Sequence, residues 1–176
     1  MENITQMEEH DSTNFHKLNT NWTLWAHLPH DTDWSINSYK CVYNFNYLEE
    51  SIALAESIPD IMVKNCMLFL MKEDVKPTWE DPCNRNGGCF SYKVSNKNVH
   101  DIWNKLFYST ISNQLSNNDS FTNSITGITI SPKKNFCIIK IWMGDSKYQN
   151  PELINIKYIN GMNNNGCLFK IHQPTF

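Results

Sequence analysis

The chain has 176 residues, of which 40% are hydrophobic and 12% are aromatic, and its formal net charge is −3. This length and composition indicate one globular domain with a buried core and exclude a disordered chain. The acidic balance argues against a general nucleic-acid binder, which would carry a basic face. Any contact with a nucleotide is therefore expected to be local and small.

The chain begins with a mostly polar and acidic segment, MENITQMEEHDSTN. It predicts a flexible tail over residues 1–15, followed by a single domain over residues 16–176. The tail lacks the apolar core of a signal peptide, and no run approaches the length of a membrane span. We therefore expect a cytoplasmic protein that does not associate with a membrane. The six cysteines have no C-x-x-C spacing, so we expect free thiols and neither a metal site nor another cofactor.

Apolar segments separated by turn signals predict the elements of the domain. In chain order these are a strand at 39–45, a helix at 47–58 that Pro59 closes, strands at 63–71 and 89–94, a helix at 98–114, strands at 125–130 and 136–143, a short helix from Pro151 and a strand at 167–172. Asn-rich loops are expected at 113–123 and 160–166. Because strands outnumber helices and few β–α–β units are visible, the fold class is α+β with a mainly antiparallel sheet.

Three segments combine tryptophan with polar residues in unusual patterns: WTLWAHLPHDTDW (22–34), KPTWEDPCNRNGGCF (76–90) and KNFCIIKIW (134–142). With these patterns, and with G-x-x-x-S-P-K before the last of them, the chain resembles the eukaryotic translation initiation factor 4E family. The similarity runs from about His16 to Trp142. The resemblance implies a curved sheet with about three helices on its convex back. It also implies a pocket on the concave side that binds the 7-methylguanosine cap of mRNA without catalysis.

The resemblance assigns the base of the cap to four residues. Trp34 and Trp79 match the pair that sandwiches the methylated guanine, whose positive charge attracts indole faces. By position alone, each of these loop tryptophans could equally be structural. Glu80 would accept two hydrogen bonds from the guanine edge, and Trp142 matches a tryptophan near the methyl group. Asp81 is expected to be an ordinary solvated acid of the loop.

Lysines are expected to bind the cap phosphates. Lys133 matches an arginine of the family, and lysine keeps the charge but loses the bidentate fork. The second basic ligand of the family falls on Ile138. Strand alternation would place Ile138, Lys140 and Trp142 on one face. We therefore hypothesise that Lys140, or Lys134 in the turn, supplies the second positive charge.

The helical back of the sheet binds scaffold and repressor peptides in this family, and here it departs from the family pattern. The principal tryptophan of that surface aligns with Ile52, and an acidic position aligns with Lys105. Loss of an anchor and reversal of a charge predict weak binding to standard peptides, and a dedicated partner is an alternative to a scaffold like initiation factor 4G. The changes could also be surface drift. The predicted partner surface comprises His16, Lys17, Leu48, Ile52, Trp103, Asn104, Lys105 and Tyr108.

Several functions fit these observations. The first is a monomeric factor that binds capped mRNA and recruits a scaffold for translation initiation. A cap-binding repressor or a protector of capped RNA would use the same pocket. A cap or nucleotide hydrolase would need a cluster of metal-binding acids, and Glu49, Glu50 and Glu56 lack the required grouping. A general single-stranded RNA binder would need a more basic chain.

Overall fold

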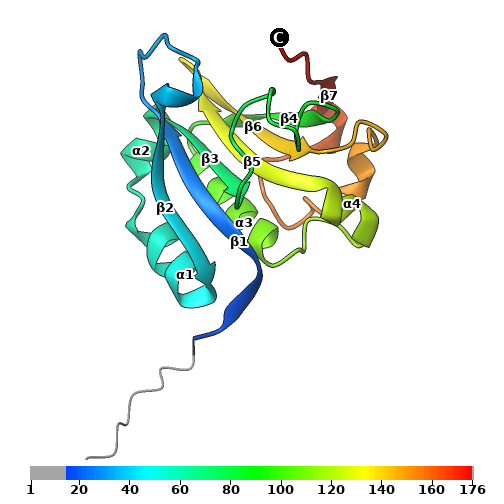
Figure 1. The fold of residues 1–176 in the computed structure, drawn as a ribbon, viewed down its shortest axis with the longest axis horizontal. Coiled ribbons are helices and arrows are strands. Elements are labelled where there is room, and N and C mark those ends of the chain that lie inside the picture. Colours follow the sequence, from blue (N-terminus) through cyan, green and yellow to red (C-terminus); the bar gives the residue numbers. More distant parts are fainter. Residues whose placement is uncertain (1–14, 176) are drawn as a thin grey trace, which may run out of the picture.

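The computed structural model describes residues 15–175, and these residues form one seven-stranded sheet (Figure 1). The strand order is β2-β1-β3-β5-β6-β4-β7, and every neighbouring pair is antiparallel. The strands are β1 (Lys17–His27), β2 (Tyr39–Tyr47), β3 (Met67–Lys72), β4 (Gly88–Ser95), β5 (Ile125–Pro132), β6 (Phe136–Met143) and β7 (Leu168–Ile171).

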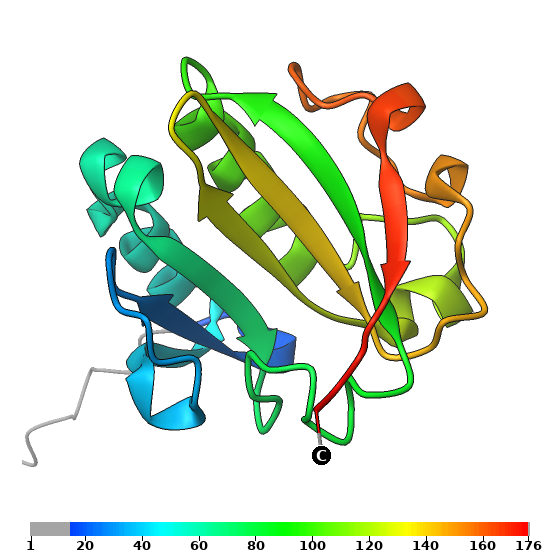
Figure 2. The same cartoon turned by 90° about the horizontal axis from the view of Figure 1, so that it is seen from above.

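Helices cover the convex side of the curved sheet and leave the other side open (Figure 2). Within the described residues they are α1 (Leu48–Ser57), α2 (Asp60–Asn65), α3 (Val99–Ile111) and α4 (Asp119–Ser124), with short 3-10 turns η1 (Ile36–Ser38), η2 (Pro151–Leu153) and η3 (Asn164–Gly166). The helices α1, α2 and α3 form the convex layer, whereas α4 leads into β5. The predicted α+β class, with about three helices on the back, is confirmed.

Strand alternation divides the side chains between two hydrophobic clusters. The main core lies between the sheet and the helices, and β6 contributes every second side chain to it. The predicted apolar stripe of α3 faces the same core. Ile138, Lys140 and Trp142 fall on the opposite face of β6, as predicted. A second cluster on the concave side is built around Phe69, Met71, Val75 and Trp142.

Four parts of the predicted secondary structure were incomplete or wrong. Strand β1 was not predicted, because its first half, KLNTN, is mostly polar and its second half was interpreted only as a tryptophan motif. The predicted strand 63–71 divides at Cys66, because residues 63–65 belong to α2 and only residues 67–71 lie in β3. The Asn-rich segment contains α4, where the Asn118 side chain accepts a hydrogen bond from the Phe121 amide. The helix expected from Pro151 is a single 3-10 turn.

The remaining boundaries agree with the prediction to within a few residues, and residues 1–14 of the predicted tail lie outside the described part of the chain. No helix among residues 15–175 combines the length and the apolarity that a membrane crossing requires.

Candidate functional site

A cavity of about 840 Å³ opens on the concave face of the sheet. Its walls are two loops, residues 28–38 after β1 and residues 73–87 after β3, and its floor comes from β3, β5 and β6. This volume lies in the range of small-molecule binding sites. Six of the residues assigned to a ligand from the sequence line it: Trp34, Trp79, Glu80, Lys133, Lys140 and Trp142.

The loop 28–38 presents Trp34, whose side chain is 56% exposed. The His27 ring stacks flat against this indole, with ring centroids 4.2 Å apart and an interplanar angle of 2°. His27 Nε2 also donates to the carbonyl oxygen of Asp33, at 2.8 Å. The Asp33 carboxylate accepts from the backbone N and the Oγ of Ser35, which lowers the pKa of Asp33. The loop is therefore fixed on both sides of Trp34.

The loop 73–87 is organised around Asn84, which is completely buried. Its Nδ2 donates to the carbonyl oxygens of Lys76, at 3.0 Å, and Thr78, at 2.9 Å. Its Oδ1 accepts from Thr126 Oγ1 on β5, at 2.8 Å. Because a buried amide with these partners cannot easily move, Asn84 fixes the backbone immediately before Trp79.

Asp81 has a structural role that the sequence prediction missed. It is buried, and its carboxylate accepts from the backbone N of Lys76, at 3.0 Å, and of Cys83, at 2.8 Å. The expectation of a solvated loop acid was wrong, because the loop folds back over its own carboxylate. Asp81 therefore holds the loop together next to its exposed neighbour Glu80.

Glu80 presents an exposed carboxylate at the rim of the cavity. The segment after β7 returns to this loop (Figure 2). There the backbone N and the Oγ1 of Thr175 donate to Glu80 Oε1, each at 3.3 Å. Arg85 donates to the carbonyl oxygen of Glu80 and leaves the carboxylate to other partners. Across the cavity, burial and the charge of Glu80 raise the pKa of Tyr39 to about 12.

Trp142 forms part of the floor and is only 3% exposed. Its Nε1 donates to Thr129 Oγ1 on the neighbouring strand, at 2.7 Å. Phe69 meets the ring edge to face, with centroids 6.5 Å apart. The indole is therefore fixed in orientation and offers only a small apolar area to a ligand.

Positive charge enters the cavity from β6 and from the turn after β5. Lys133 and Lys140 line the cavity, whereas Lys134 is not among its lining residues. Of the two lysines that the sequence left open, Lys140 is therefore the one that lines the cavity. Sequence reasoning missed Lys170 on β7, whose Nζ lies 5.6 Å from the centroid of the Trp79 ring. In the sheet, Cys89 on β4 is the register partner of Lys170 on β7 and of Trp142 on β6. The proximity of Lys170 to the cavity could therefore be inferred only with knowledge of the strand order.

Two histidines were also missed. His27 stacks on Trp34 as described, and His172 stacks on Trp79, with centroids 5.5 Å apart and an interplanar angle of 15°. His172 is buried, which lowers its pKa, and its Nδ1 donates to the carbonyl oxygen of Asn84, at 2.8 Å. The alternation of β1 places His27 on the same face as Trp25, but nothing in the sequence pairs either histidine with a particular tryptophan.

The predicted partner surface on the helical back is only partly exposed. Leu48 and Ile52 on α1 are each more than one third exposed. Trp103 is 0% exposed and lies in the main core, so the expectation that it contacts a partner was wrong for its side chain. Its indole fills the space between α3 and the sheet. Asn104 and Lys105 follow it at the half-buried border of α3.

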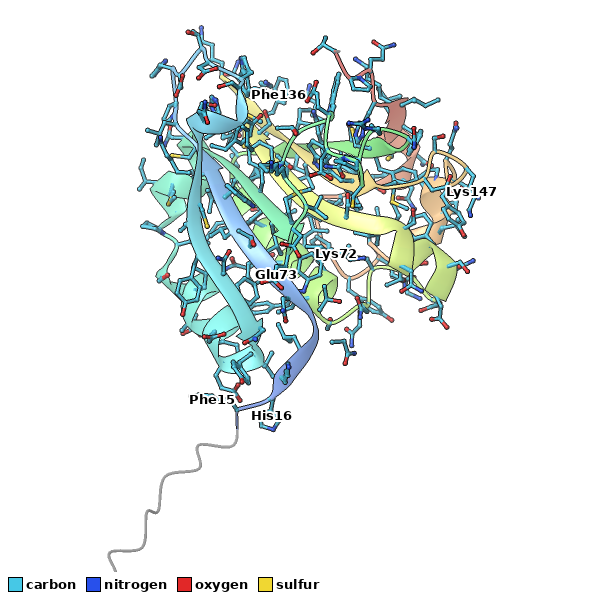
Figure 3. All side chains as sticks on the ribbon, in the orientation of Figure 1. Phe15, His16, Lys72, Glu73, Phe136 and Lys147 are labelled. Atoms are coloured by element: carbon cyan, nitrogen blue, oxygen red, sulfur yellow. The ribbon has the colours of Figure 1, made fainter. Side chains whose placement is uncertain are left out.

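The other residues of this surface have local partners. Lys105 forms an i,i+4 ion pair with Asp101, with 2.7 Å between Nζ and Oδ2. His16 Nδ1 lies 2.6 Å from Glu49 Oε1, which lowers the pKa of Glu49. Figure 3 shows His16 where the chain enters β1. Lys17 is the first residue of β1, and Tyr108 is half-buried on α3.

The arrangement defines a curved antiparallel sheet with an aromatic pocket on its open side. The same fold occurs in Ascaris suum eIF4E-3, solved in complex with m7G cap, with a TM-score of 0.75, 20% identity, and coverage of 92% of this chain and 94% of that one. It also occurs in C. elegans eIF4E-3, solved with the 4E-binding protein Mextli and cap analog, with a TM-score of 0.70, 23% identity, and coverage of 79% and 80%.

Sequence comparison identifies the family. The sequence model described as eukaryotic initiation factor 4E matches residues 17–175, so the chain belongs to the eukaryotic initiation factor 4E family. Eukaryotic translation initiation factor 4E of Eremothecium gossypii is 31% identical over 143 residues, and that of Saccharomyces cerevisiae is 29% identical. Both alignments cover 75% of this chain and 65% of the relative, so the match spans less than two thirds of the length of these relatives.

Proposed function

We propose that this protein binds the 7-methylguanosine cap of mRNA in the concave cavity and promotes cap-dependent translation initiation in the cytoplasm. The observation that carries the proposal is the pair of loop tryptophans, Trp34 and Trp79, which line one cavity from opposite loops together with Glu80. Family membership and the similarity to a cap-bound fold support the same conclusion.

The base is recognised by charge and by hydrogen bonding. The N7-methylated guanine is cationic, and it is attracted to the electron-rich faces of two indoles. Each base–aromatic stack contributes about 1–3 kcal/mol. Glu80 accepts from the N1–H and the exocyclic amine of guanine, in place of its present contact with Thr175. Adenine has no equivalent pair of donors, so Glu80 selects the base.

The phosphates lie along the lysine side of the cavity. Lys133 and Lys140 line it, and Lys170 lies next to Trp79. In our proposal, Lys140 takes the position of the second basic ligand, because it is on the same face of β6 as Trp142. Lys170 is the third cation within reach. Three flexible lysines bind phosphates through charge rather than through a fixed fork, which makes this part of the affinity salt-dependent.

The helical back recruits the partner. Exposed Leu48 and Ile52 give α1 a small apolar area for an amphipathic helix. Lys105 on α3, although paired with Asp101, adds positive charge to the helical back and disfavours a basic segment. The surface therefore binds standard scaffold peptides weakly and fits a dedicated partner with acidic residues. This altered surface is also the observation that favours the second candidate, a cap-binding repressor that recruits no scaffold.

The proposal is tested by calorimetric titration with 7-methylguanosine triphosphate. Trp79→Ala should weaken binding about 5- to 150-fold, the equivalent of one lost stack. Glu80→Gln should weaken binding and reduce the preference for guanine over adenine. Glu73→Gln is the matched control, because it removes the same charge from the start of the same loop and outside the cavity (Figure 3). Equal loss in both glutamine variants would contradict the assignment of Glu80.

A pull-down then separates initiation from repression. Cap-loaded protein should retain a scaffold protein if it promotes initiation, and it should support cap-dependent translation in an extract depleted of its own cap-binding factor. Binding of the cap together with inhibition in that assay would favour the repressor.

A further inference from the structure

Each of the two cavity tryptophans has a histidine ring behind it. His27 stacks on Trp34 and His172 stacks on Trp79, yet only the tryptophans line the cavity. The imidazoles therefore cover the indole faces that are turned away from the cavity. Each histidine also donates to a carbonyl of the loop that carries its tryptophan: His27 to Asp33, and His172 to Asn84.

The contact between His27 and Trp34 is the closer of the two. The rings are parallel within 2° at 4.2 Å, and the tether to the Asp33 carbonyl immediately precedes Trp34 in the chain. The other groups that face His27 are the Asp33 carboxylate and the Tyr39 ring, which meets it edge-on at 5.1 Å. His27 is 2% exposed, so it is enclosed between these groups and the indole.

His172 differs in its surroundings. Its Nε2 is buried and has no hydrogen-bond partner among the described residues, so a proton there would lack an acceptor. Burial lowers the pKa of His172, the charge of Lys140 acts in the same direction, and Glu80 opposes both. Lys170, above the Trp79 ring, is the remaining charge on that side. His172 therefore stays neutral where an ordinary histidine begins to be protonated.

We propose that His27 and His172 are positioning residues that hold the two tryptophans in the orientation that stacks on a cationic base. This inference rests on the proposed function. The imidazole behind each indole holds that ring in place and leaves its other, electron-rich face available to the ligand.

His27→Ala removes the ring behind Trp34, whereas His27→Phe keeps a flat ring there. The affinity for 7-methylguanosine triphosphate should fall about fivefold in His27→Ala, because binding must then order the indole, and His27→Phe should restore most of the loss. Equal affinity in the wild type and His27→Ala would overturn the inference for Trp34. The same pair of substitutions at His172 tests the support of Trp79.

A second measurement does not depend on the ligand. Without a ring behind Trp34, both faces of its indole are open to solvent, so acrylamide should quench the fluorescence of ligand-free His27→Ala more than that of the wild type or of His27→Phe. The difference should be absent when Trp34→Phe is combined with His27→Ala. Equal quenching in all three proteins would overturn the inference. If the protein binds no methylated nucleotide, the proposed function fails, and the quenching alone decides whether His27 supports Trp34.

Discussion

Asn84 offers the sharpest test of how the 73–87 loop positions Trp79 and Glu80. Its side chain makes three buried hydrogen bonds, to the carbonyls of Lys76 and Thr78 and to the hydroxyl of Thr126. Asn84→Ala removes all three and leaves their partners unpaired. At about 1 kcal/mol for each bond, the free energy of unfolding should fall by about 3 kcal/mol. For a chain of this size, the melting temperature should fall by about 6–12 °C.

The same substitution should weaken ligand binding, because the loop must then be ordered at the expense of binding energy. We expect on the order of tenfold lower affinity for 7-methylguanosine triphosphate at a temperature where the variant is folded. The assays are calorimetric melting and calorimetric titration on the same sample.

Asn86→Ala is the control for Asn84→Ala. Asn86 is exposed in the same loop, and its backbone carbonyl rather than its side chain accepts from Ser146. Its stability should stay within about 0.5 kcal/mol of the wild type. If Asn84→Ala melted and bound like this control, the reasoning about the loop would be refuted.

Three further predictions concern the lysines, the buried histidine and the helical back. Lys140→Ala should weaken binding and lower the salt dependence of the affinity, measured by titration at several salt concentrations, whereas Lys134→Ala should change neither. The reverse result would assign phosphate binding to Lys134 in the turn. Because burial lowers the pKa of His172 from its ordinary 6.5, the unfolded chain takes up that proton first, so stability should be lost as the pH falls below about 6.5. In melting curves this loss should be smaller in His172→Gln, and an unchanged loss would assign it to other groups. Ile52→Trp combined with Lys105→Glu should tighten binding of a standard scaffold peptide by about tenfold in calorimetry, and unchanged affinity would show that these two positions do not set partner choice.

The sequence predicted the cavity better than it predicted what supports the cavity. Trp34, Trp79 and Glu80 could be assigned because their motifs resemble those of the family, and the structure brings all three to one cavity. Strand periodicity also predicted the face of β6 that carries Lys140 and Trp142. These predictions depend on local pattern, which a single sequence contains.

Long-range contacts explain what the sequence could not show. His172 is 88 residues from its partner Asn84, and Asp81 becomes buried only when its loop closes. For Trp103 the local pattern was the better guide. Its place in an apolar stripe indicated a core residue, whereas the resemblance suggested a surface role that its burial contradicts. Packing between elements decided each case, and local patterns do not specify it.

The most direct test of the account is a titration of intrinsic tryptophan fluorescence with methylated and unmethylated guanosine triphosphate. Trp34 is the exposed indole of the cavity, so stacking of a base should change its emission strongly. The account predicts saturable quenching by the methylated nucleotide, and quenching by the unmethylated form only at far higher concentration. Equal quenching by both nucleotides, or none by either, would contradict a cap-binding cavity.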